Sequence, residues 1–543
     1  MQKGDLPGAR SAFEKAVQSD PASADAQNML GQVLLQQGDV DGAVEHLRTL
    51  VKLRPKLAIA HAYLAQALQA RGQSNEAVRE LRRAVELAPH QSEAHRSLAH
   101  ALSLQGKADE AIAEMKEAVR LSPQSADLHD ELGVLLAQQS KFKDAEAAFR
   151  QAIKFDSQDE PAYLHLGAAL CSEDSFQEAE PPLAQAVKLD SHDATAWYYQ
   201  GVALEATGNR EPALQSFTHA AELQPDSAPA QTHLGLLAQR LGDTDRAVAA
   251  FTKVVRQNPG DAEGHNNLAL TLLQRGDGDG AIKEFQEAIK LRPDDAEFQQ
   301  NLGTAYLQKT DFDAAVSQFR GALKLTPASA GLHYDLALAL KLKDDLPAAM
   351  NEWKEAIRLD PKLADAHYSL GITLWQSGDF PAAAEQLRAA IQIQPDYAEA
   401  YYTLGTVLKQ MEKYPEAADA LRQAIKLQPD FAGAHTTLAA VLRQLGDSAG
   451  AAEQAKAGAE ISKQQNNLQA ATFATNSGRR LLGVGDVDGA ISQFRSAITA
   501  VPGYAQAHYQ LGLALTQKGE KQEARKEFQR ATELDPHLTA PAH

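Results

Sequence analysis

The sequence predicts an all-α fold, an α-α superhelix made of tandem pairs of antiparallel helices. Three observations predict it: a proline that recurs with a fixed period, two apolar stripes at helical spacing in each period, and a Gly-Asp turn between the stripes. Successive prolines are 34 residues or a multiple of 34 apart, at Pro21, Pro55, Pro89, Pro123, Pro225, Pro259, Pro293, Pro327, Pro361, Pro395 and Pro429. Such a period is typical of a solenoid, in which each repeat buries its apolar face against its neighbours.

Each period reads as a first helix, a turn and a second helix. The first helix carries a small residue ten positions after the proline, as at Gly31, and the turn follows, as at Gly38-Asp39. The second helix carries a small residue twelve positions beyond the first small one, as at Ala43. A large apolar residue such as Phe149 follows four positions later, and the next proline ends the helix. The small residues allow close helix approach, and the large residue fills the space between repeats.

This pattern resembles the tetratricopeptide repeat. The resemblance is carried by Leu132-Gly133 in a first helix, Ala145 and Phe149 in the second helix, Pro123 at a boundary, and Trp197 at the aromatic position of a first helix. It covers essentially the whole chain. The resemblance implies a right-handed superhelical array whose first helices line a concave groove, through which such arrays bind peptides.

The period divides the chain into repeats. We expect residues 1–23 to be a partial repeat with only a second helix, 24–465 to hold thirteen repeats, and 471–543 to hold two repeats and a short tail. The repeats start at residues 24, 58, 92, 126, 160, 194, 228, 262, 296, 330, 364, 398, 432, 471 and 505. The five extra residues 466–470 lie in a polar segment without glycine or proline, so we expect longer helices there and not a loop.

Composition excludes several classes of partner. The formal net charge of −18 argues against nucleic acid, because phosphate binding requires clustered lysine and arginine. No apolar run approaches the roughly 20 residues that span a bilayer, so we expect no membrane insertion. Because the chain starts within a repeat, we expect a protein that was cut from a longer one or that starts late. If the N-terminus is authentic, we expect a soluble, cytoplasmic protein.

Chemistry-bearing residues do not form a catalytic or metal-binding pattern. Eight histidines recur at the fourth position of the first helix, one per repeat, at His61, His95, His129, His265, His333, His367, His435 and His508. Histidines a full repeat apart cannot reach one ion, so we expect them to be structural. No phosphate-binding loop, nucleophile elbow or zinc-protease helix occurs. We therefore expect no cofactor, no metal and no enzyme activity.

The candidate site lies on the face of the first helices that the core leaves free. Counting positions from the first residue of each repeat, positions 2, 5, 6, 9, 12 and 13 point away from the core. Equal positions of successive repeats form ladders, and residues 262–445 combine amides, aromatic rings and positive charge on them. The candidate residues are Asn266, Asn267, Gln300, Asn301, Tyr334, Lys341, Tyr368, Trp375, Tyr402, Lys409 and Arg443.

These ladders favour a non-catalytic scaffold that binds extended or helical segments of partner proteins. The alternative is the substrate-recognition arm of a larger enzyme, such as O-linked N-acetylglucosamine transferase. The asparagine ladder of that enzyme is matched only by Asn267, Asn301 and Asn476. An envelope or pilus assembly factor is a further alternative, to be recognised by a lipid anchor or a secretion signal. Exposed repeat faces at both ends would also allow end-to-end self-association.

Overall fold

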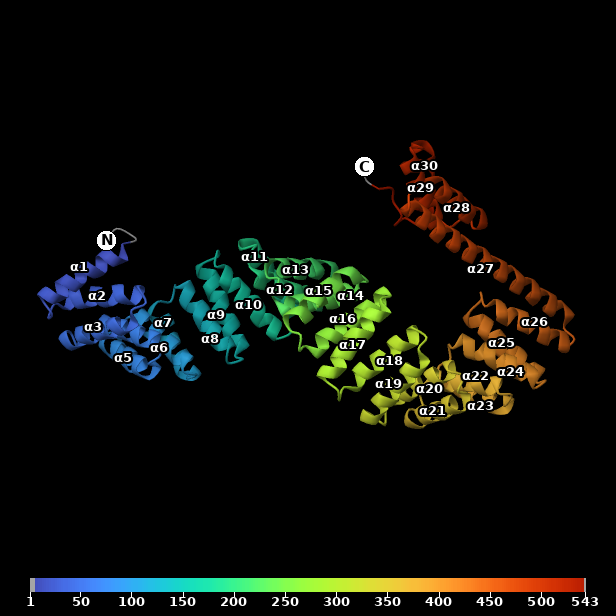
Figure 1. The fold of residues 1–543 in the computed structure, drawn as a ribbon, viewed down its shortest axis with the longest axis horizontal. Helices are drawn as coiled ribbons and strands as arrows, with labels where there is room; N and C mark the ends of the chain where they lie inside the picture. The colour runs from blue at the N-terminus through green and yellow to red at the C-terminus, as the bar shows by residue number, and fades with distance from the viewer. Residues whose placement is uncertain (1–4, 542–543) are drawn as a thin grey trace. The chain divides into compact units, whose positions relative to one another are not determined.

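The computed structural model describes residues 5–541 of the chain, and these form 30 α-helices and no β-strand. The chain divides into two units, Met1–Pro293 and Asp294–His543. Figure 1 shows the helices of each unit, labelled in chain order. The all-α fold of antiparallel helix pairs is confirmed. Residues 1–4 of the expected partial repeat and residues 542–543 of the expected tail lie outside the described residues.

The helix bounds follow the 34-residue period in both units. The N-terminal unit contains α1 Leu6–Ser19, α2 Ala24–Gln36, α3 Val40–Leu53, α4 Ala58–Ala70, α5 Ser74–Leu87, α6 Ser92–Leu104, α7 Ala108–Leu121, α8 Ala126–Ala137, α9 Phe142–Phe155, α10 Glu160–Ser172, α11 Phe176–Leu189, α12 Ala194–Ala206, α13 Arg210–Leu223, α14 Ala228–Arg240, α15 Thr244–Gln257, α16 Ala262–Arg275 and α17 Gly278–Leu291. The C-terminal unit contains α18 Ala296–Gln308, α19 Phe312–Leu325, α20 Ala330–Leu342, α21 Leu346–Leu359, α22 Ala364–Gln376, α23 Phe380–Ile393, α24 Ala398–Gln410, α25 Tyr414–Leu427, α26 Ala432–Gln444, α27 Ser448–Gly483, α28 Val487–Ala500, α29 Ala505–Lys518 and α30 Lys521–Leu534.

The core of each repeat lies between its two helices. Phe251 of α15 is fully buried, and its ring faces Gly235 of α14 so closely that a Cβ added there would lie 2.7 Å from Cζ of Phe251. Gly133 meets Phe149 in the same way in α8 and α9. The small residue that recurs in each first helix is therefore required by the large residue of the second helix, because the two helices pack in close contact.

The conformation and hydrogen bonding of the backbone explain both residues of the Gly-Asp turn. Gly38 has a φ of +80°, which is the left-handed region that residues with a Cβ rarely adopt. Asp39 then caps α3, because its Oδ1 accepts a hydrogen bond of 3.1 Å from the Gly42 N–H. Asp447 caps α27 in the same way, from the Gly450 N–H at 2.9 Å. The turn thus ends one helix and starts the next within three residues.

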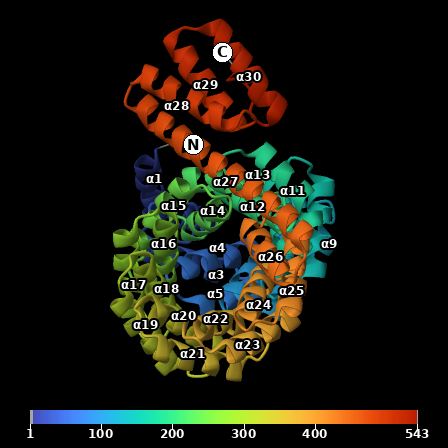
Figure 2. The same ribbon diagram turned by 90° about the vertical axis from the view of Figure 1, so that its right-hand side faces the viewer.

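Helix α27 departs from the repeat pattern, because it is 36 residues long and includes the whole segment 461–470. Its first half is the second helix of the repeat that starts at residue 432, and its second half is the first helix of the repeat that starts at 471. Figure 2 shows it as one unbroken rod, with α26 beside its first half and α28 beside its second. The register of the last repeats is fixed by Gly478, where an added Cβ would meet the ring of Phe494 at 2.5 Å.

Candidate peptide-binding face

Two neighbouring first helices line a cavity in the N-terminal unit. In the N-terminal unit, a cavity of about 560 Å³ opens between α4 and α6. Apart from Leu81 of α5, every lining residue occupies position 2, 5, 6, 9 or 12 of a first helix: Ile59, Ala62, Tyr63, Gln66, Gln69, Glu93, Arg96, Ser97 and His100. At this cavity, the lining positions of the two first helices are among those that the helical period directs away from the core.

The candidate residues are divided between the two units. Asn266 and Asn267 lie on α16 of the N-terminal unit, and the other nine lie in the C-terminal unit. Asn266 is only 3 % exposed, so its amide lies inside the packed layer and not on the groove wall as expected. The helical period gives the direction of a side chain but not the depth to which neighbouring helices cover it. Asn267 and Asn301 are both half-buried.

The three tyrosines at position 5 are half-buried and contact their own chain. The ring of Tyr368 packs on Tyr397, which precedes the next first helix, with ring centroids 4.8 Å apart. Tyr402 packs on Phe431 in the same way at 4.6 Å. The pKa of Tyr368 is raised above its ordinary value because the side chain is buried, and a hydrogen bond with Thr403 reduces this increase. These rings therefore join successive repeats and leave only part of their surface for a ligand.

The position 12 ladder presents cations and one indole. The ammonium of Lys341 lies 5.9 Å from the ring centroid of the buried Trp353, within the range of a cation–π contact. The indole N–H of Trp375 donates to Oε1 of Gln410 at 3.0 Å. Lys409 is half-buried and Arg443 exposed, and neither forms an ion pair within the described residues. Within the described residues, the charges of Lys409 and Arg443 are therefore not paired with a carboxylate.

Polar groove residues also bond to the following repeat, at a spacing of 35 residues. Gln300 donates from Nε2 to Oδ2 of Asp335 at 2.6 Å, which joins position 5 of α18 to position 6 of α20. Burial raises the pKa of Asp335, and the bond from Gln300 acts against this shift. The same 35-residue step joins Asp130 and His165 at 2.8 Å. Gln300 is therefore already occupied by a structural contact.

Sequence reasoning missed a cluster on α6 and α8 of the N-terminal unit. Arg96 donates from Nε to Oε2 of Glu131 at 3.0 Å, and His100 Nε2 lies 2.8 Å from the same oxygen. Burial alone would raise the pKa of Glu131, but the hydrogen bonds from His100 and Arg96 hold it below its ordinary value. Beside the cluster, Leu104 is 80 % exposed and lines a second cavity of about 240 Å³. Leu104 occupies position 13, where many repeats carry glutamine. This departure from the repeat pattern was the sequence feature that could have drawn attention to the region.

The recurring histidines are part of a structural clasp. His95 shows the pattern, since Nε2 lies 3.2 Å from the carbonyl oxygen of Pro89 and Nδ1 lies 2.6 Å from Oε2 of Glu114. His61, His265, His333 and His508 make the equivalent pair of contacts. No group of three metal-ligating side chains that could hold an ion occurs in residues 5–541. Each ring joins the loop, the first helix and the second helix of one repeat.

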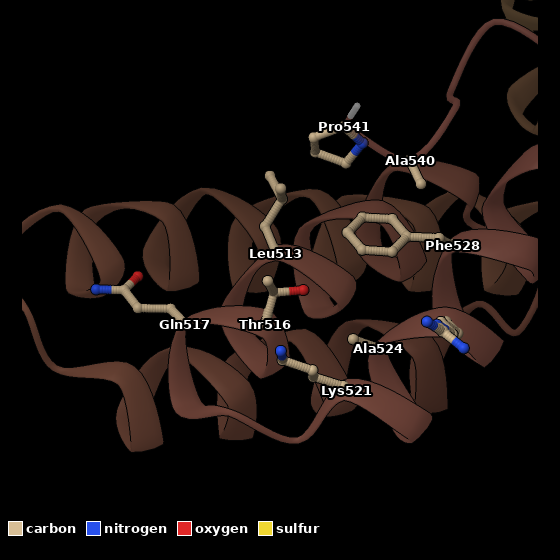
Figure 3. A pocket seen from close by; sticks show the side chains of 9 residues that line it. Leu513, Thr516, Gln517, Lys521, Ala524, Phe528, Ala540 and Pro541 are labelled. Carbon is tan, nitrogen blue, oxygen red and sulfur yellow. The ribbon is translucent and has the colours of Figure 1, made fainter. Parts of the chain in front are cut away.

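A further cavity, of about 760 Å³, lies on the side of α29 and α30 that faces away from the preceding repeat (Figure 3). Leu513 and Phe528 form its apolar floor, Ala540 and Pro541 lie over one side, and Lys521 lies on the other. This is the face on which a further repeat would stack in the interior of an array. The expected end-to-end self-association would use this surface and stays a prediction.

The comparisons with solved structures found several similar proteins. YrrB, a tetratricopeptide protein with an unusual peptide-binding site, is 23 % identical over 33 % of this chain and 93 % of its own, with a TM-score of 0.31. MamA is 26 % identical over 30 % of this chain and 95 % of its own, with a TM-score of 0.29. Yeast Tom70 is 18 % identical over 78 % of this chain and 96 % of its own, with a TM-score of 0.36. No curated protein matches this chain.

Within the described residues, none of the helices has both the length and the apolar character needed to cross a membrane. A family model described as tetratricopeptide repeat matches residues 1–58, 105–160, 168–228, 233–296 and 475–538. Further tetratricopeptide models match residues 34–101, 296–329 and 398–431, and one described as TPR repeat matches 340–378 and 374–412. The matches cover more than half of the chain, which therefore belongs to the tetratricopeptide repeat family.

Proposed function

We propose that this chain is a non-catalytic scaffold that binds peptide segments of partner proteins on the inner face of its C-terminal unit. A tetratricopeptide array is typically a non-catalytic interaction scaffold. The observation that carries the proposal is the position 12 ladder on α20, α22, α24 and α26, with Lys341, Trp375, Lys409 and Arg443. Because Lys409 and Arg443 form no ion pair within the described residues, they are available to an acidic partner.

The chemistry of this face suits an extended or helical segment with acidic side chains. Lys409 and Arg443 would attract carboxylates, including a C-terminal one. The glutamines at position 13, which include Gln376, Gln410 and Gln444, are exposed and can bond a peptide backbone without reading its side chains. The exposed edges of Tyr368 and Tyr402 add contact area at a low cost in side-chain entropy, because both rings are already held in place.

The test is a titration of labelled twelve-residue peptides of acidic, neutral and basic composition, followed by fluorescence anisotropy. We expect the acidic set to bind, and the Lys409→Ser/Arg443→Ser variant to weaken that binding at least tenfold. The matched control is Lys413→Ser/Lys426→Ser, which removes the same charge from the exposed side of α25 and its N-cap. Equal affinities of the two variants, or the absence of any preference for acidic peptides, would refute the proposal.

Substitution of the tyrosines is a poorer test of this site. Tyr334, Tyr368 and Tyr402 all pack against the apolar core of their own repeats. Their replacement by alanine would remove packing as well as ligand contacts, so lost binding could not be separated from lost stability. Lys409 and Arg443 avoid this difficulty, because neither side chain forms a hydrogen bond or an ion pair within the described residues.

The alternative function, the recognition arm of a larger enzyme, rests on the asparagines. Asn267 and Asn301 are half-buried and Asn476 is exposed on α27. Only three repeats carry asparagine at position 6, which is a sparse ladder for backbone recognition. The alternative predicts binding that is insensitive to peptide charge, so the charge series above also separates the two functions.

A further inference from the structure

The fused helix α27 interrupts the stack of repeats. In a regular repeat, a proline loop turns the chain back so that the next first helix packs on the preceding second helix, as α24 packs on α23. In α27 these two helices are collinear, so the face of each that normally receives the other is left uncovered. The uncovered face can be compared position by position with the other repeats.

The second half of α27 lacks the side chains that stack regular repeats. Position 7 is leucine in nearly every other repeat, as at Leu404 and Leu438, but is Ser477 here. Position 10 is small or apolar elsewhere and buried in almost every repeat, as at Val407 and Val441, but is the exposed Arg480 here. A charge at this position could not be covered by a regular repeat without a large desolvation cost.

The first half of α27 shows matching changes. Position 24 is a large, fully buried residue in other repeats, as at Leu421 of α25, but is Ala455 in α27. Position 28 is a half-buried isoleucine in α25, Ile425, but is the exposed Ala459 in α27. Both halves therefore lack the side chains that stack the other repeats, which agrees with the uncovered face of α27.

Phe473 is the exception on this otherwise small and polar face. It occupies position 3, which is buried in every other complete repeat, including those with a large side chain such as Phe298 and Leu332. In α27 the same position leaves the phenylalanine ring 69 % exposed. Pairing with another molecule would remove this ring from water, and an aromatic side chain contributes more contact area than the alanines beside it.

Phe473 belongs to a line of exposed residues along one side of α27. The line consists of Ala452, Ala459, Asn466, Phe473 and Arg480, each seven residues from the next and each exposed. Seven residues turn an α-helix by about 20° less than two full turns, so neighbours in the line point nearly the same way and Ala452 and Arg480 each deviate from Asn466 by about 40°. Asn466 lies at the centre, with two alanines on one side of it and the large side chains on the other.

We propose that a second copy of this chain pairs with the first through antiparallel contact of the two α27 helices, about a twofold axis at Asn466. About that axis, each large side chain of the line in one copy lies opposite a small side chain in the other copy. Phe473 of each copy meets Ala459 of the other, Arg480 meets Ala452, and the two Asn466 amides face each other. A twofold interface requires this reciprocity, and a central asparagine pair is a known means of fixing the register of paired helices.

Charge favours the same arrangement. Residues 447–465 carry Asp447, Glu453 and Glu460 against Lys456 and Lys463, which leaves a net charge of −1 on this side of Asn466. Residues 467–483 carry Arg479 and Arg480 and no acidic residue. Antiparallel pairing places the acidic end of each helix beside the basic end of the other, whereas parallel pairing would place like charges together. The alanines allow the backbones to approach closely, so that the two phenylalanines enter the space that the alanines leave.

The first test is sedimentation velocity of the full chain over a range of concentrations. We expect a concentration-dependent dimer that Phe473→Ser abolishes and that high salt weakens. The control is Val484→Ser, which removes an apolar side chain of 81 % exposure from the C-cap of the same helix, off the proposed line. Phe473 is exposed, so its substitution should leave the circular dichroism spectrum unchanged.

The second test uses cysteine cross-linking in a Cys171→Ser background, since Cys171 is the only native cysteine. Asn466→Cys should form a disulfide-linked dimer under oxidation, because the two side chains meet at the axis. Gln464→Cys is the matched control, since it lies two residues away on the opposite side of α27 and is also exposed. A chain that stays monomeric, a dimer that survives Phe473→Ser, or equal cross-linking of the two cysteine variants would each overturn the proposal.

Discussion

Glu160, the first residue of α10, has a carboxyl group whose pKa is set by its surroundings. Its Oε1 is buried without a hydrogen-bond partner among the described residues. Burial, together with the nearby Asp193 and Asp190, raises the pKa of Glu160 to about 7. The carboxyl group is therefore more easily ionised in the unfolded chain than in the folded one, which couples its protonation to the stability of the repeat.

This coupling predicts a pH-dependent effect of Glu160→Gln. Between the unfolded pKa of about 4.3 and the folded pKa, the folded state holds the proton more tightly, so stability falls as pH rises through that window. The substitution removes this loss, and we expect a higher melting temperature at pH 8 with little change at pH 4. Thermal denaturation at both pH values checks the prediction. The control Glu211→Gln changes an exposed first-turn glutamate of α13, and an equal gain there would contradict it.

The clasp around position 4 belongs to the scale of the repeat, because it ties one loop to two helices. Its chemistry requires an N–H donor at this position, and histidine is not the only residue that supplies one. In the first complete repeat, Gln27 donates from Nε2 to the carbonyl oxygen of Pro21 at 2.9 Å, and His46 meets Oε1 of Gln27 at 2.7 Å. In this repeat the histidine is on the second helix, and its hydrogen-bond partner is on the first helix. The first helix still donates a hydrogen bond to the loop carbonyl.

The exchanged pair provides a rescue experiment. His95→Ala leaves the Pro89 carbonyl and Glu114 without their partner, and we expect a loss of about 1–3 kcal/mol in the free energy of local opening of this repeat. The double variant His95→Gln/Glu114→His reproduces the arrangement of Gln27 and His46 and should recover most of that loss. Hydrogen exchange of the α6 and α7 amides measures the local free energy in all three proteins. If the double variant is no more stable than His95→Ala, the clasp does not act as described.

The repeat scale also shows where sequence reasoning succeeds and where it stops. The helix pairs, the Gly-Asp turns and the groove positions follow from a fixed period, since the same short-range packing recurs in each repeat. The depth of Asn266 and the bond between Gln300 and Asp335 depend on contacts between repeats, which the direction of one helix does not reveal. The segment 461–470 was expected to lengthen helices, but its lack of helix-breaking residues did not show that they form one helix, α27.

For the whole chain, the important property is that contacts are local. Within each unit, helices pack mainly on their neighbours in the sequence, as α6 packs on α5 and α7, so a disturbance should spread only to adjacent repeats. The unfolding of such an array is not a single all-or-none transition. A substitution that destabilises one repeat can therefore show how many neighbouring repeats depend on it for their stability.

Hydrogen exchange of the His95→Ala variant tests this property. The lost clasp lies between α6 and α7, so we expect faster amide exchange in α5 to α8, because the stability of each repeat depends on its own fold and on its two interfaces. Exchange in α20 to α26 should stay as in the unaltered chain, since no described contact connects these helices with the clasp. Exchange measured by mass spectrometry on peptides from both regions distinguishes the outcomes. Equal acceleration in both regions would mean that the chain unfolds as one cooperative body, contrary to the behaviour expected of a solenoid.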